Sequence, residues 1–116
     1  MPQQVERLDA VTATPRFHRV LLENDFVRVL DTIVPPGEIV PLHTHCWSAV
    51  LYIVSWSNCV RRDGEGRVTM DSRNTAEPPP GTALWSGPLP PHTLENVGDC
   101  ELRVIAIEQK QSVAQL

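Results

Sequence analysis

The sequence has no run or stripe of basic residues. Lysine and arginine together number 10, against 14 aspartates and glutamates, so the net charge is −4. Nucleic-acid binding therefore has no electrostatic basis here, because proteins that hold the phosphate backbone cluster their basic side chains. The sequence also lacks the run of roughly 18 apolar residues that a membrane-spanning helix needs. We expect neither a nucleic-acid partner nor a membrane.

Cysteine is scarce and unpaired in its spacing. The three cysteines, Cys46, Cys59 and Cys100, are an odd set that does not describe a disulfide framework. We interpret Cys46 as a buried, inert thiol and assign no role to the other two. Residues 1–10 are polar and lack the apolar stretch of a secretory signal peptide. We therefore expect a soluble, reduced protein of the cytoplasm.

A 3.6-residue apolar period is missing along the sequence, which argues against amphipathic helices. Proline is instead abundant, with 11 residues in a chain of 116, and proline interrupts helices. Short apolar and β-branched runs are separated by turn-forming residues, which is typical of an all-β sandwich or barrel. We predict about eight to ten short antiparallel strands from these signals.

The candidate strands share apolar or β-branched residues between turn signals. They are residues 17–22, 26–34, 38–45, 47–56, 67–72, 81–85, 92–97 and 101–108. Residues 58–62 can continue the fourth strand. Residues 63–66, Asp-Gly-Glu-Gly, predict a hairpin turn, since Asp-Gly tolerates positive φ. Residues 87–91, which contain three prolines, predict a stiff loop.

The length of the chain fits one domain and is too short for two. We predict a loose N-terminal arm over residues 1–16 and a single β-barrel domain over residues 17–108. Residues 109–116 are polar and predict a frayed C-terminal tail.

Two histidines stand two residues apart in one candidate strand. Side chains at i and i+2 point to one face of a strand, so His43 and His45 project together. Their predicted face also carries Ile39, Pro41 and Trp47, which are apolar. Paired imidazoles on an apolar inward face fit a divalent metal ion as their partner. Taken alone, such a pair also occurs at surfaces and in cores without a metal.

Two motifs resemble those of the cupin superfamily. The stretch GEIVPLHTH, from Gly37 through His43 to His45, is similar to the first cupin motif. The stretch HTLEN, which begins at His92, is similar to the end of the second, and Gly81 stands where that motif begins. The order and separation of the two motifs are also cupin-like.

The resemblance covers residues 26–108 and implies a fold and a metal site. The fold is the double-stranded β-helix, a jelly roll also called the cupin barrel. The metal ligands implied are His43, His45 and His92. The ion would be divalent, with Fe(II) favoured and Ni, Zn or Mn as alternatives.

The sequence departs from the cupin pattern at the glutamate ligand of the first motif. Ala49 and Val50 stand at its position, and neither binds a metal ion. Glu108, near the end of the last candidate strand, is a less favoured substitute. Three neutral imidazoles leave the ion its full charge and at least one open position. Such a site resembles that of the thiol dioxygenase branch, which uses Fe(II), but weaker ligation also admits a pocket that has lost its metal.

The apolar segment at residues 47–56 alternates between two predicted faces. If it shares the parity of the histidine pair, its inward residues are Ala49, Leu51 and Ile53. Its outward residues then include Val50, Tyr52 and Val54. An apolar outer face is a candidate surface for a second subunit. Because cupins are frequently dimers, we expect a homodimer.

Two arginines and three tryptophans could reach the barrel interior. Arg28 and Arg103 lie on candidate strands, and we interpret both as outward and solvated. Trp47, Trp56 and Trp85 can line a pocket, although packing in a core or an interface is the more common role of large aromatic residues.

Three classes of function stay open at this level, and the fold does not choose among them. The preferred one is a mononuclear metal-dependent oxygenase, in particular a dioxygenase, acting on a small polar molecule. The second is a metal-dependent isomerase, lyase or hydrolase without redox chemistry. The third is a module that binds or senses a small ligand without turnover. No catalytic side chain is assigned.

Overall fold

The structure is a computed structural model that describes residues 7–110 of the chain. The strands of this range are β1 His18–Glu23, β2 Val27–Val34, β3 Ile39–His45, β4 Ala49–Ser55, β5 Cys59–Asp63, β6 Val68–Asp71, β7 Ala83–Ser86, β8 Leu89–Asn96 and β9 Leu102–Gln109. A short helix, α2 Ala10–Ala13, precedes β1, and a 3-10 turn, η1 Ser72–Asn74, follows β6. The predicted all-β architecture is confirmed. Within residues 7–110, no helix is long and apolar enough to cross a membrane.

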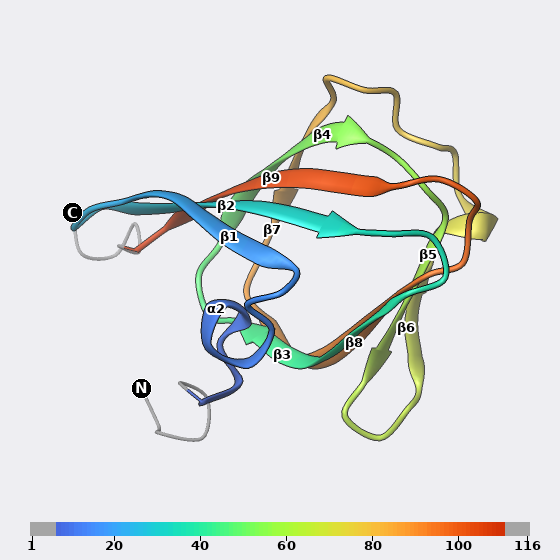
Figure 1. Ribbon diagram of the computed structural model, residues 1–116, viewed down its shortest axis with the longest axis horizontal. Helices are drawn as coiled ribbons and strands as arrows, with labels where there is room; N and C mark the ends of the chain where they lie inside the picture. The colour runs from blue at the N-terminus through green and yellow to red at the C-terminus, as the bar shows by residue number, and fades with distance from the viewer. Residues whose placement is uncertain (1–6, 111–116) are drawn as a thin grey trace.

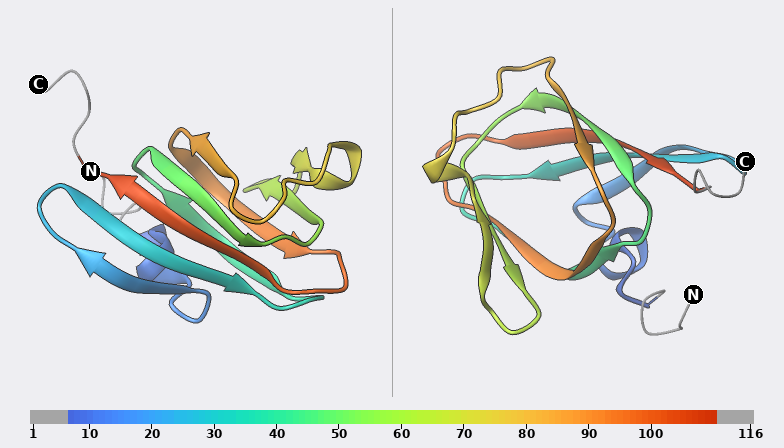
Figure 2. Two further views of the ribbon diagram at one scale, coloured as in Figure 1. Left: turned by 90° about the horizontal axis from the view of Figure 1, so that it is seen from above. Right: turned by 180° about the vertical axis from the view of Figure 1, so that it is seen from behind.

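The strands form two antiparallel sheets that face each other around the interior. One sheet has the order β1-β2-β9-β4-β7, and the other has the order β3-β8-β5-β6. Figure 1 looks into the barrel, with β4, β9 and β2 along its upper wall and β3 and β8 along its lower wall. The rear view in Figure 2 shows the same enclosure from its other end. Side chains that point inward from both sheets therefore share one interior.

Two strand predictions need correction. Residues 58–62 do not continue β4, because β5 belongs to the opposite sheet. The chain crosses between the sheets at Ser57, whose Oγ donates to Oδ1 of Asn96 at 2.7 Å. Residues 87–91 are not wholly a loop, because β8 begins at Leu89 and includes two prolines. The β3–β8 ladder is irregular between His43 and His45, so it accommodates prolines that cannot donate.

The predicted inward face of β3 is wrong near its start. Ile39 is 53% exposed and Pro41 is also exposed, whereas Val40 is fully buried. The register shifts between Val40 and His43, so these residues point inward although they stand three apart. A bulge changes the parity of a strand in this way. Alternation along β4 follows the prediction, with Ile53 buried and its neighbours on either side exposed.

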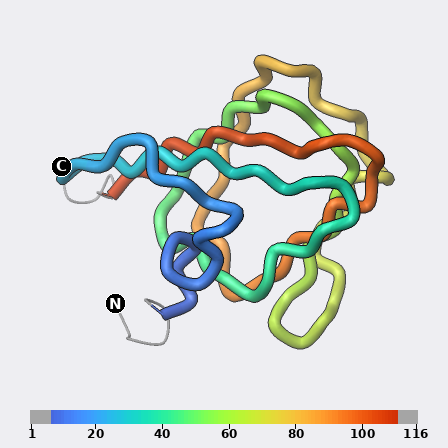
Figure 3. Tube along the Cα trace, viewed as in Figure 1, coloured from blue at the N-terminus to red at the C-terminus, as the bar shows by residue number. Residues whose placement is uncertain are grey.

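The predicted loose arm over residues 1–16 also needs correction within its described part, residues 7–16. Ala10 is fully buried and packs with Leu30 and Ala106. The side chain of Asp9 caps α2, and the backbone N–H of Thr14 donates to Ala10 O at 2.9 Å. Figure 3 shows this turn of the chain lying against the barrel, where α2 contacts β1 and β3. Residues 1–6 and 111–116 lie outside the described range.

Asn96, the last residue of the second motif, has a structural role. Its side chain is fully buried, and its Nδ2 donates to Val34 O and Cys100 O at 2.9 and 2.8 Å. Its Oδ1 accepts from Ser57 Oγ and from the backbone of Gly98. The amide therefore joins three segments of the chain.

Candidate metal centre and its cavity

Four histidines meet inside the barrel, and we call them the histidine cluster: His18 on β1, His43 and His45 on β3, and His92 on β8. The ring centroid of His43 lies 4.2 Å from that of His92 and 5.0 Å from those of His18 and His45. The His45 centroid lies 5.3 Å from that of His18 and 5.7 Å from that of His92. The structure thus brings the three predicted ligands together and adds a fourth imidazole.

His18 is the residue that sequence reasoning missed. His18, His43 and His45 each offer one ligand atom, and these three atoms lie within 4.8 Å of one another. This triad contains His18 where the predicted triad contains His92. His18 stands outside both cupin motifs, and a lone histidine at the start of a strand carries no signal. Only the pairing of β1 with β2, which places His18 opposite Thr32, directs its ring into the barrel.

A repeated local arrangement orients His43 and His92. The Nδ1 of His43 donates to Pro41 O at 2.8 Å, and the Nδ1 of His92 donates to Pro90 O at 2.7 Å. A carbonyl oxygen can only accept, so Nδ1 carries the proton in both rings. Each neutral ring therefore presents the lone pair of Nε2, which is the form that binds a metal. The two histidines also face each other across the β3–β8 ladder.

The other two rings are oriented by side chains. Thr14 Oγ1 donates its only proton to Ala10 O at 2.6 Å, so at 2.9 Å from His18 Nδ1 it acts as the acceptor. The Nδ1 of His45 donates to Oε2 of Glu108 at 3.1 Å. In all four rings, Nδ1 thus donates a hydrogen bond to an oxygen atom. This leaves the four Nε2 atoms as candidate metal ligands.

Glu108 holds His45 and does not take the place of the missing glutamate ligand. Its carboxylate is fully buried, and Oε1 accepts from Nε of Arg28 at 2.6 Å while Oε2 accepts from His45. Burial alone would raise the pKa of Glu108, but the hydrogen bonds and charges of His45 and Arg28 outweigh burial and lower it. Glu108 is therefore an anion that orients an imidazole, as carboxylates do behind metal-binding histidines.

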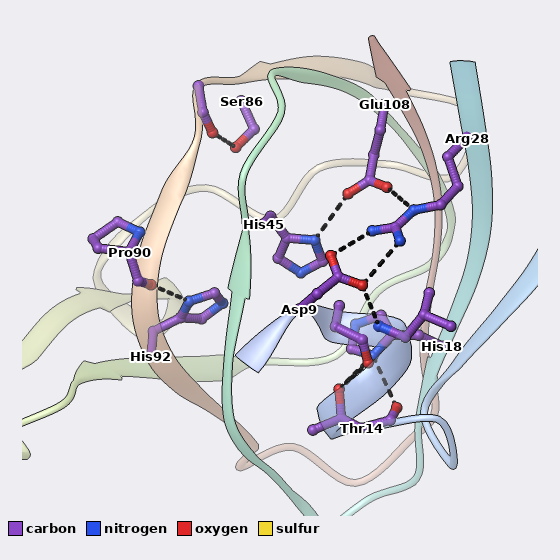
Figure 4. Close-up of polar contacts among 12 residues, drawn as sticks. Asp9, Thr14, His18, Arg28, His45, Ser86, Pro90, His92 and Glu108 are labelled. Carbon is purple, nitrogen blue, oxygen red and sulfur yellow. Dashed lines mark hydrogen bonds and ion pairs between the residues drawn. The ribbon is translucent and has the colours of Figure 1, made fainter. Parts of the chain in front are cut away.

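Arg28 is buried, so the prediction that it points outward into solvent is wrong. It is 6% exposed, and its NH1 and NH2 donate to the two carboxylate oxygens of Asp9, each at 2.9 Å. Arg28 lies opposite Glu108 in the β2–β9 ladder, which places both side chains on the inner face. Figure 4 shows the guanidinium between the two carboxylates, with His45 beyond Glu108. Arg103, by contrast, pairs with Asp31 and is partly exposed.

Burial keeps His18, His43 and His92 neutral. It lowers the pKa of His43 to about 2 and the pKa values of His18 and His92 to about 4. A neighbouring histidine adds to this effect at each of the three rings. Neutral imidazole is the state that a metal ion requires, so at neutral pH no proton has to leave these three rings.

The metal-free protein is expected to lose stability as the pH falls from 7 to 5. The unfolded chain takes up protons below the ordinary histidine pKa of 6.5, whereas His18, His43 and His92 stay neutral in the folded protein until lower pH. Stability therefore falls with pH by on the order of 1 kcal/mol per unit for each such histidine. Urea unfolding at several pH values measures this slope. A His92→Gln variant should show a shallower slope, and equal stability at pH 7 and 5 would contradict the assignment.

A cavity of about 310 Å³ adjoins the histidine cluster, at the lower end of the size range for small-molecule sites. The apolar residues of its wall are Val40, Trp47, Ala49, Leu51, Ile53, Trp56, Met70, Leu84, Leu89, Leu94, Leu102, Val104 and Ala106. Polar side chains other than histidine are few, and they include Thr32, Arg61, Ser86 and Glu108. Trp85 is 62% exposed and does not belong to this wall.

Comparison with known proteins gave matches in structure alone. No protein-family model and no curated protein matches the sequence. A cupin domain from Bordetella pertussis Tohama I is 22% identical, with a TM-score of 0.66 over 81% of this chain and 92% of that chain. An RmlC-like cupin with a double-stranded β-helix fold from Methanocaldococcus jannaschii is 13% identical, with a TM-score of 0.56 over 79% and 77%.

A third solved structure with the same architecture is the polyketide cyclase RemF from Streptomyces resistomycificus. It is 20% identical, with a TM-score of 0.53, and the match covers 81% of this chain and 64% of that chain. The fold is thus shared with proteins of very different sequence.

Proposed function

This chain has the cupin fold, and on that premise we propose that it binds one divalent metal ion through the histidine cluster and acts on a small molecule in the adjoining cavity. One observation carries the proposal: all four rings give Nδ1 to an oxygen acceptor, which leaves Nε2 of each ring available to a metal. Packing of four histidines in a core would not by itself require Nδ1, and not Nε2, to form the hydrogen bond in every ring.

The donor set fits a first-row divalent ion. Imidazole nitrogen suits Fe, Ni, Cu and Zn, and a cluster made of histidines alone among the described residues leaves the charge of the ion undiminished. Fe(II) remains the favoured ion in this proposal, with Ni, Zn or Mn as alternatives. An ion bound here would supply Lewis-acid chemistry and, if redox-active, electron exchange with oxygen.

The residues of the chain divide the remaining tasks. Glu108 holds the ring of His45, and Arg28 keeps Glu108 ionised and in place. The apolar wall excludes water and binds the body of the substrate. We therefore replace the small polar substrate expected from the sequence with a molecule that is mostly apolar and has one polar end. On this basis a metal-dependent oxygenase is the preferred activity.

A non-redox reaction is the second candidate, and one observation favours it. The polyketide cyclase with the same fold indicates that such a barrel can serve ring closure, which needs no change of oxidation state. An apolar cavity beside a Lewis acid suits that chemistry as well.

Metal substitution separates the two candidates. The Fe(II)-loaded and Zn(II)-loaded proteins are offered thiols, diketones and flavonols under oxygen, with oxygen uptake and product formation followed together. The oxygenase proposal predicts uptake with Fe(II) and none with Zn(II), which does not exchange electrons. Equal turnover with Zn(II) and no oxygen uptake would favour the non-redox candidate. Binding without turnover under either metal would leave a ligand-binding module.

A further inference from the structure

Arg61 lies in the cavity wall without an ionic partner. It is on β5, and both Cys59 and Arg61 line the cavity. The other arginines that are not exposed, Arg28, Arg62 and Arg103, each pair with a carboxylate at 3.0 Å or less. Within residues 7–110, the guanidinium of Arg61 has neither an ion pair nor a side-chain hydrogen bond. Arg61 is thus distinct among the partly buried cations.

Among residues 7–110, no acidic side chain forms an ion pair with Arg61. Its neighbours across the ladders are Leu94 on β8 and Met70 on β6, and both also line the cavity. Asp63, two residues along β5, is already engaged, because its Oδ2 accepts from Nε of Arg67 at 3.0 Å. The Oδ1 of Asp63 accepts backbone N–H groups of the hairpin turn. The positive charge of Arg61 therefore has no ionic partner in the described part of the chain.

A partly buried cation in an apolar wall is unfavourable unless something pairs with it. Burial lowers the pKa of Arg61, because removal from water disfavours the charged form of the guanidinium. The guanidinium of Arg61 is thus a donor group of the cavity wall without an acceptor among the described residues, which matches an anionic oxygen brought by a ligand.

Arg61 is also close to the histidine cluster. His92 lies opposite Asp63 in the β5–β8 ladder, so Arg61 is its diagonal neighbour. Diagonal neighbours have Cβ atoms about 7–8 Å apart, which long side chains span. The charge of Arg61 contributes to the lowered pKa of His92, after burial and the effect of His45. A single small ligand can therefore contact the guanidinium and the histidine cluster together.

We propose that Arg61 binds the carboxylate of a small substrate whose apolar body fills the cavity and whose acidic end lies beside the histidine cluster. A guanidinium binds a carboxylate through two parallel hydrogen bonds, which also fixes the orientation of the ligand. The proposal names the substrate class for the function proposed above and rests on it for the reaction. The contact with the carboxylate itself requires no metal.

The test uses the full-length, metal-free protein and matched probes. Benzoate, 3-phenylpropionate and hexanoate are each compared with the corresponding amide, and binding is followed by tryptophan fluorescence, since Trp47 and Trp56 line the cavity. The wild type should bind each acid at least about 10-fold more tightly than its amide, as expected for a hydrogen-bonded charge pair. Arg61→Met should remove this preference, whereas Arg62→Met, on the same strand, should keep it.

Stability provides a second readout. Arg61→Met should be at least as stable as the wild type in thermal unfolding, because it removes an unpaired cation from an apolar wall. A purely structural arginine would instead lose stability on replacement. An unchanged preference for acids in Arg61→Met, or no acid binding by the wild type, would overturn the proposal.

Repeating the titrations with the zinc-loaded protein separates this proposal from the function on which it rests. Failure to take up zinc, together with an acid preference that depends on Arg61, would reject the metal site alone. Zinc uptake without such a preference would reject the role of Arg61 alone.

Discussion

Arg28→Met is expected to lower the free energy of unfolding by about 3–5 kcal/mol, the usual effect of leaving a buried charge unpaired. The guanidinium of Arg28 lies between Glu108, which is fully buried, and Asp9, which is 14% exposed. Methionine fills a similar volume but leaves both carboxylates without their cation. Urea unfolding of the metal-free protein at pH 7 measures the loss.

Two further variants identify the cause of that loss. Arg62→Met removes a half-exposed pair with Glu95, and its expected effect is within about 1 kcal/mol. Adding Glu108→Gln to Arg28→Met removes one of the stranded charges and should restore part of the stability. A loss no greater for Arg28→Met than for Arg62→Met would show that the buried network contributes little.

Removal of His18 and His92 together is expected to abolish tight zinc binding, whereas each single removal should only weaken it. Zinc sites in proteins that leave a position for substrate keep three protein ligands. Four imidazoles therefore tolerate the loss of one, and the double variant His18→Ala/His92→Ala retains only His43 and His45. Competition with a chromophoric chelator measures the affinity of each variant.

The same titration tests whether Glu108 orients a metal ligand without binding the ion itself. Loss of a group that orients a ligand typically weakens metal binding about 10- to 100-fold, and we expect Glu108→Gln to weaken zinc binding by a factor in this range. A silent His18→Ala would show that the ion is held by His43, His45 and His92 alone. A silent His92→Ala would instead select the triad of His18, His43 and His45.

Much of the fold followed from local signals. Turn-forming residues separate the strands, and the hairpin predicted at residues 63–66 is present, with Gly66 at a φ of +86°. The resemblance to the two cupin motifs implied that His43, His45 and His92 share one site, and their rings lie together because β3 pairs with β8. Alternation predicted the inward side of β4, since a regular strand has a period of two.

The features that escaped prediction depend on pairing between distant strands. The bulge near the start of β3 reverses the parity of Val40, and no local pattern marks it. Arg28 and Glu108 are opposite each other only because β2 pairs with β9, in a register set by the whole sheet. An arginine on a short strand reads as solvated until its partner across the ladder is known.

The cavity also depends on the pairing of distant strands. Its wall consists of side chains from both sheets, and in the sequence each of them is indistinguishable from an ordinary core residue. The unpaired state of Arg61 becomes visible only when every neighbouring acid has been placed. The substrate expected at the level of sequence was a small polar molecule, whereas the enclosed apolar wall favours an apolar body.

X-ray absorption spectroscopy of the protein reconstituted with one equivalent of zinc tests the central claim most directly. The account predicts nitrogen scatterers at about 2.0–2.1 Å with the multiple scattering of at least three imidazoles, and loss of this signal in His43→Ala/His45→Ala. A first shell without imidazole, or a spectrum unchanged in that variant, would contradict it.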